Sequence, residues 1–132
     1  MNEKNNYITD YSIANLNNDG IFPFAETQRA ATRLALTEFE NVANLKFVEL
    51  DETASQVGKI PFAFTDAEQK LDSGTLAAGW ASGPHSSAAA GDVWIYSDLM
   101  ATTENWDQGS STNFSTLLHE IGHTLGLNHP FD

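Results

Sequence analysis

The sequence predicts one domain of the α/β (or α+β) class, with helices packed on a mixed sheet. Segments with the two-residue period of strands alternate along the chain with two segments that have the period of a helix. The 132 residues fit a single domain, 1–132, which is long enough to bury a hydrophobic core. A hydrophobic content of 41% also excludes a disordered chain.

The first half of the chain is expected to contain three strands and one long helix. Residues 7–13 are rich in aromatic and β-branched side chains and predict a strand, and the Asn-rich stretch 15–20 predicts a turn. From about 25 to 43, apolar residues recur at steps of three and four, which predicts a helix. Residues 45–50 and 59–65 then predict two further strands.

The second half is expected to supply two more strands and the second helix. A region rich in Gly, Ser and Ala contains the stretch 77–82, which is interpreted as a short strand. Residues 91–97 alternate in the manner of a strand. The polar residues 109–113 include good helix N-caps, and the segment that follows predicts a helix to about residue 125.

Composition excludes several classes of partner. The formal net charge of -12 disfavours nucleic acid and anionic membrane surfaces, and no segment is apolar enough to span a bilayer. The absence of cysteine excludes disulfides and Cys-based zinc sites. The first residues contain no apolar segment of the kind found in a secretory signal. We expect a monomer.

The second helix separates its apolar residues from its histidines. At about 100° per residue, the apolar side chains fall on one stripe that should face the core. This stripe consists of Phe114, Leu117, Leu118, Ile121 and Leu125. His119 and His123 fall on the opposite side, one turn apart, and Glu120 projects to one side of this pair.

Three of the four histidines are therefore candidate metal ligands. Two imidazoles at i and i+4 can bind one Zn²⁺, and Gly126 stands where a left-handed turn would end the helix and bring His129 to the same ion. Three protein ligands leave a fourth position open, as in a catalytic site, and Glu120 would reach a water there. The alternative is an amphipathic helix with merely exposed histidines, which the spacing of Gly126 and His129 disfavours.

These residues form the motif H-E-x-x-H-x-x-G-x-x-H, which resembles that of the metzincin zinc endopeptidases. Five positions carry the motif: His119, Glu120, His123, Gly126 and His129. The residues around it resemble those of the serralysin group of bacterial secreted proteases: Ile121, Gly122, Leu127 and Pro130. Residues 25–50 resemble, more loosely, the helix and strand that open that catalytic domain.

The resemblance implies a metzincin-like twisted sheet with a long packing helix and an active-site helix. It implies zinc on His119, His123 and His129, with Glu120 as the catalytic base, and a location outside the cell. The stretch Gly79-Trp80-Ala81 looks like the edge strand along which the family binds an extended protein or peptide substrate. A strand Trp is also common in a core, so both interpretations of Trp80 stay open.

The resemblance also has limits along the chain. Phe131 stands where serralysins usually have Gly. The methionine turn, the tyrosine ligand and the glycine-rich calcium repeats of serralysins find no counterpart after the third histidine. We therefore interpret the chain as the N-terminal part of a zinc metalloprotease catalytic domain, truncated before the Met-turn. The alternative function is a catalytically incompetent zinc- or calcium-binding domain of a secreted protein.

A second metal hypothesis concerns the turn before the first helix. Five residues fall at positions of an EF-hand calcium loop: Asn15, Asn17, Asp19, Gly20 and Glu26. Only two of them are charged, and the segment before the loop is expected to be a strand rather than a helix. The alternative is an Asn-rich turn in which Glu26 interacts with the helix dipole.

Overall fold

The computed structural model describes residues 3–8, 21–50, 58–66, 78–81, 83, 91–98, 106 and 112–129. These residues form six strands and two helices. The strands are β1 (Glu3–Ile8), β2 (Ile21–Phe22), β3 (Leu45–Glu49), β4 (Ile60–Thr65), β5 (Gly79–Ala81) and β6 (Val93–Tyr96). The helices are α1 (Glu26–Val42) and α2 (Thr112–Thr124).

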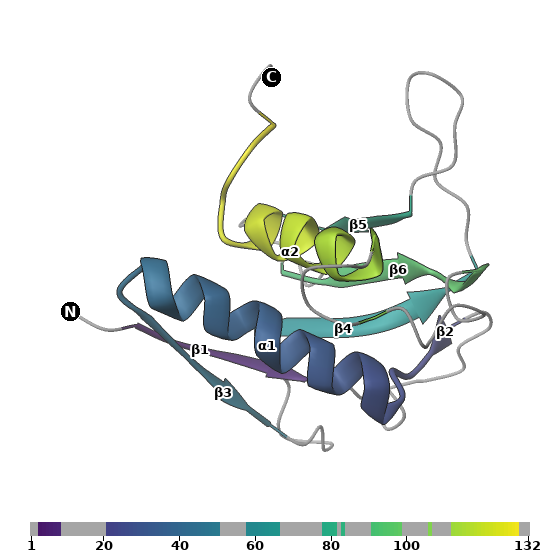
Figure 1. Cartoon of the computed structure of the whole chain (residues 1–132), viewed down its shortest axis with the longest axis horizontal. Coiled ribbons are helices and arrows are strands. Elements are labelled where there is room, and N and C mark those ends of the chain that lie inside the picture. Colours follow the sequence, from purple (N-terminus) through teal and green to yellow (C-terminus); the bar gives the residue numbers. More distant parts are fainter. Residues whose placement is uncertain are drawn as a thin grey trace.

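The strands form one mixed sheet in the order β3-β1-β4-β6-β5, with β2 also paired to β4. β1 runs parallel to β3 and β4, and β4 runs parallel to β6. β5 is antiparallel to β6, with Trp80 opposite Trp94, and it forms one edge of the sheet. α2 lies beside this edge in Figure 1, whereas α1 crosses the β1–β4 region of the sheet.

One hydrophobic cluster joins both helices to the central strands. α1 contributes Ala31, Ala35 and Leu36, and α2 contributes Phe114, Leu117 and Ile121. The sheet contributes alternate residues of β4 and β6: Ile60, Phe62, Phe64, Val93 and Ile95. This packing fixes the position of α2 against the sheet, because burial of several large apolar side chains on one helix face outweighs any single surface contact.

The structure confirms the mixed α/β class and most of the predicted elements. It also corrects the start of the first strand, which was expected at residue 7 and is found at Glu3 in β1 (Glu3–Ile8); residues 9–13 of the predicted strand lie outside the described part of the chain. The sequence EKNNYI has little β-branched or aromatic character. Its parallel pairing with β3 and β4 therefore overrides local propensity. The short strand β2 was not predicted.

Candidate metal centre and active site

α2 presents a different buried face from the one that its apolar residues predict. Phe114, Leu117 and Ile121 lie in the core as expected, whereas Leu118 and Leu125 are only partly buried at its margin. The polar side chains Asn113, Glu120 and Thr124 are buried instead. The buried face of the helix is therefore turned toward its Glu120 side, the side on which Gly79 of β5 approaches Thr116 and shares a cavity with Glu120. His119 remains exposed and His123 is half-buried.

The end of α2 is a Schellman motif centred on Gly126. The backbone N–H of Leu127 donates to the Gly122 carbonyl at 3.0 Å, and the N–H of Gly126 donates to the His123 carbonyl at 3.0 Å. Gly126 has a φ of 99°, which a residue with a Cβ rarely adopts. The turn reverses the chain, so that residues 127–129 run back beside the last turn of the helix.

This reversal brings three imidazole nitrogens together. The Nε2 atom of His119 lies 3.0 Å from that of His123 and 3.0 Å from that of His129. The Nε2 atoms of His123 and His129 are 3.2 Å apart. Zinc–nitrogen bonds of about 2.0–2.1 Å in tetrahedral geometry require nitrogens about 3.3 Å apart. The three side chains therefore fit one such ion, and they are a potential metal-binding group within the described residues.

Loss of contact with solvent shifts the pKa values of His119 and Glu120 in opposite directions. The pKa of His119 is lowered from its ordinary value, first by burial and then by the charges of His123 and His129. This favours the neutral imidazole, which is the form that binds a metal. The pKa of Glu120 is raised by burial, and the positive charge of the neighbouring imidazoles partly opposes the shift. A carboxylate with a raised pKa holds a proton more strongly than an exposed one.

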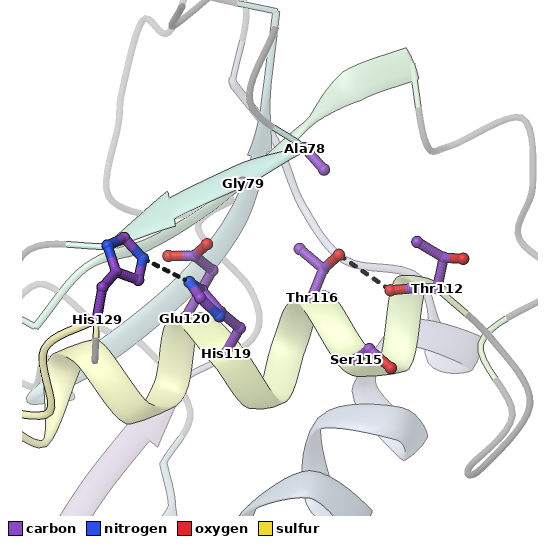
Figure 2. A pocket seen from close by; sticks show the side chains of 8 residues that line it. All are labelled: Ala78, Gly79, Thr112, Ser115, Thr116, His119, Glu120 and His129. Atoms are coloured by element: carbon purple, nitrogen blue, oxygen red, sulfur yellow. Dashed lines mark hydrogen bonds between the residues drawn. The ribbon is translucent and has the colours of Figure 1, made fainter. Parts of the chain in front are cut away.

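A cavity of about 450 Å³ opens beside Glu120, between α2 and β5. Figure 2 shows the Glu120 carboxylate on the cavity side of α2, close to the His119 and His129 rings. The cavity is lined by Ala78, Gly79, Thr112, Ser115, Thr116, His119, Glu120 and His129. Sequence reasoning did not select the hydroxyl residues of this set, although their i, i+3 and i+4 spacing from Thr112 places them on one helix face.

The three residues that were expected to bind substrate form β5, all of them half-buried. A Cβ added to Gly79 would lie 2.9 Å from the Trp94 carbonyl oxygen of β6 and 3.2 Å from Thr116 Cγ2 of α2, so the close packing of β5 against these two elements favours glycine there. Trp80 is outside the hydrophobic cluster that joins the helices to the sheet. Ala81 packs against that cluster and also lines a second cavity, of about 490 Å³, with His123 and His129.

The calcium hypothesis remains a prediction. Four of its five residues lie in the stretch 15–20, outside the described part of the chain. The fifth, Glu26, opens α1, and its Oε1 atom lies 2.8 Å from the Arg33 guanidinium, which also bonds Glu49. The described position of Glu26 is thus explained by an ion pair within α1, to Arg33, which in turn pairs with Glu49 at the end of β3.

Comparison with known proteins agrees with a metal centre formed by His119, His123 and His129. The family model of the matrixins, peptidase M10, matches residues 3–132. The chain belongs to this family. It is 38% identical over 115 residues to "Serralysin A" of Dickeya chrysanthemi, a match that covers 86% of this chain and 23% of the relative.

Two further relatives also match most of this chain. The "Serralysin" of Photorhabdus sp. (strain Az29) is 34% identical over 111 residues, covering 84% of this chain and 22% of the relative. "Metallopeptidase AprA" of Pseudomonas marginalis is 31% identical over 130 residues, a match that covers 96% of this chain and 26% of the relative. The chain is therefore a serralysin-like matrixin, which confirms the family that its motif indicated. It spans about a quarter of the length of these relatives.

Proposed function

We propose that this chain is the zinc-binding part of an endopeptidase that hydrolyses peptide bonds in extended protein substrates. The observation that carries the proposal is the convergence of three Nε2 atoms, at 3.0–3.2 Å from one another, beside a buried glutamate that contributes none of them. A purely structural metal site would use a closed set of four ligands and would need no base.

His119, His123 and His129 would hold Zn²⁺. When bound, zinc supplies a Lewis acid that polarises a carbonyl and makes a water molecule acidic near neutral pH. The lowered pKa of His119 supports its role as a ligand, because that imidazole stays neutral to lower pH than an isolated one in water.

Glu120 would act as the general base and then as the general acid. It takes a proton from the attacking water while the water oxygen bonds to the scissile carbonyl carbon. It then delivers that proton to the leaving amine as the carbon–nitrogen bond breaks. Its buried position at the wall of the cavity between α2 and β5 supports this role, because its carboxylate faces the same space as two of the imidazoles (Figure 2).

The two outer edges of the sheet differ in a way that supports substrate binding on β5. At the β3 edge, the backbone N–H of Phe47 already donates to the Glu40 carboxylate at 2.8 Å, and Arg33 covers Glu49. The β5 edge lies between the two cavities that border the histidines. An extended peptide would pair with Gly79, Trp80 and Ala81 as an added strand, with its side chains directed toward these cavities.

An assay with an unstructured protein substrate tests the proposal. We expect this chain, or a C-terminally extended one that contains it, to cleave the substrate when loaded with zinc, a chelator to abolish cleavage, and added zinc to restore it. His123→Ala should lose both metal and cleavage. Zinc binding without turnover would instead support the alternative, a metal-binding domain without catalysis. Cleavage that survives complete removal of metal would contradict the proposal.

We further propose that the protein acts outside the cell as a monomer, with proteins or peptides as its substrates. The resemblance to serralysins supports the extracellular location, and the net charge of -12 disfavours nucleic acid as a partner. Neither helix in the described part of the chain has the length and apolar character needed to cross a membrane.

A further inference from the structure

His123 makes a contact that distinguishes it from the other histidine on α2. Its Nδ1 atom lies 2.7 Å from the backbone carbonyl oxygen of Leu127. A carbonyl oxygen can only accept a hydrogen bond, so Nδ1 must carry the hydrogen. In the neutral ring the other nitrogen, Nε2, then has a free lone pair, which points toward the Nε2 atoms of His119 and His129.

The Leu127 carbonyl is held in place by the turn that ends α2. The N–H of the same residue donates to the Gly122 carbonyl at 3.0 Å, and Gly126 just before it has the positive φ of the turn. The Leu127 side chain lies over Gly122, where an added Cβ would be 3.6 Å from Leu127 Cδ1. The backbone of Leu127 is thus tied to the last turn of the helix through its N–H, and its carbonyl lies within hydrogen-bonding distance of His123.

We propose that the backbone carbonyl of Leu127 is a positioning group that fixes the tautomer and ring orientation of His123 before any metal binds. This inference rests on the proposed function, in which Nε2 of His123 is a zinc ligand. A ligand histidine whose other nitrogen is held by a hydrogen bond needs no tautomer change on binding, and such partners are commonly worth about 10–100-fold in metal affinity.

His119 provides a matched control on the same helix. The contacts of His119 in the described part of the chain use Nε2, toward His123 and His129. No described backbone carbonyl accepts a hydrogen from its Nδ1 atom, although His119 lies only one turn before His123. The structure therefore assigns the backbone restraint to one of the two helix histidines and not to the other.

The first test is nitrogen NMR of the metal-free chain with labelled histidine, at about pH 8, where imidazoles are neutral. We expect His123 to be in the Nδ1–H form, whereas an unconstrained imidazole favours the Nε2–H form. An Nε2–H form for His123 would overturn the inference. Because no metal is present, this result does not depend on whether the protein is a protease.

The second test replaces one histidine at a time by Nδ1-methylhistidine, which keeps Nε2 as a ligand but cannot donate from Nδ1. Zinc affinity is measured by competition with a chelator, and the thermal midpoint of each metal-free variant checks that it folds. We expect the change at His123 to weaken zinc binding by about 10–100-fold, and the change at His119 to weaken it much less.

Equal losses at the two positions, or no loss at His123, would overturn the role of Leu127 while leaving the zinc site intact. A parent chain that binds no zinc at all would instead contradict the proposed function, and the NMR result would still decide the tautomer. The two failures are therefore distinguishable.

Discussion

Glu120 is a buried carboxylate in a chain that is otherwise rich in exposed acids. Only 6% of its surface is accessible, and burial raises its pKa. The charges of His123 and His129 oppose that shift, so the pKa rises less than burial alone would raise it. This balance suits a residue that must both accept and release a proton.

Glu120→Gln separates catalysis from metal binding. The amide keeps the shape of the side chain but cannot accept the proton of the attacking water. Zinc should stay bound at about one ion per chain, and cleavage should fall by roughly 10²–10⁴-fold, the usual contribution of a positioned general base. Metal analysis and a peptide-cleavage assay on the same sample measure both quantities. Loss of zinc in this variant would mean that Glu120 is a ligand or a structural group.

The pH dependence of zinc binding follows from the three imidazole ligands. A protonated imidazole cannot bind the metal, so protons compete with zinc as the pH falls through the ligand pKa values. The lowered pKa of His119 means that this ligand resists protonation until below its ordinary value of 6.5. We expect zinc to be retained at about pH 8 and largely released at about pH 5 on dialysis. Equal retention at both values would argue against a three-histidine site.

At the scale of elements, the C-terminal turn of α2 decides whether the third histidine reaches the other two. Gly126→Val would force a β-branched residue to a φ of 99°, a strain of about 1–3 kcal/mol. We expect weaker zinc binding although residue 126 contacts no metal. Gly126→Asn is the matched control, since Asn tolerates the left-handed conformation. Isothermal titration with zinc compares the two, and equal affinity of the Val variant and the parent would contradict the prediction.

The contact between β5 and α2 can be tested at Gly79. In Gly79→Ala the new methyl group would meet the Trp94 carbonyl oxygen of β6 and Thr116 of α2, so β5 must shift relative to both elements. Cleavage should fall, because the Glu120 wall of the cavity shifts. Zinc should stay bound, because all three histidines lie within the segment 119–129.

Adding Thr116→Ser removes the Cγ2 atom and should restore part of the cleavage lost in Gly79→Ala. The contact with the Trp94 carbonyl remains, so recovery should be incomplete. Full cleavage by the single variant would show that the spacing of the two elements does not matter to the reaction.

The elements also show what the sequence could and could not predict. The period and termini of both helices were readable, because the apolar spacing of α1 and the glycine after α2 are local signals. Which face of α2 is buried could not be predicted from the sequence. The burial of Asn113, Glu120 and Thr124 depends on where the strands β5 and β6 pack. The start of β1 was missed for the same kind of reason, since residues 3–6 are in a strand because they pair with distant residues. The juxtaposition of the three histidines followed from spacing alone, and their roles stay predictions.

At the scale of the whole molecule, the ligands and the core share one helix, so metal binding should stabilise the fold. α2 contributes three residues to the central hydrophobic cluster and two of the three histidines. Zinc at a thousand times its Kd would add about 4 kcal/mol to the free energy of unfolding. Thermal unfolding should therefore shift upward with zinc for the parent and for Glu120→Gln, but not for His123→Ala. A shift of equal size in the His123→Ala variant would place the stabilising metal elsewhere.

His119 and His129 are separated by only ten positions in the sequence, and a single turn joins them. The entropy lost in closing so short a loop is small, so the three ligands need little of the remaining fold to meet. The sheet, by contrast, requires β1 to find β3 across some forty residues of chain. The metal centre thus has a low contact order within a domain of higher contact order. A nascent chain would be able to capture zinc as soon as the end of α2 forms, with the bound ion then favouring the helix on which the core is assembled.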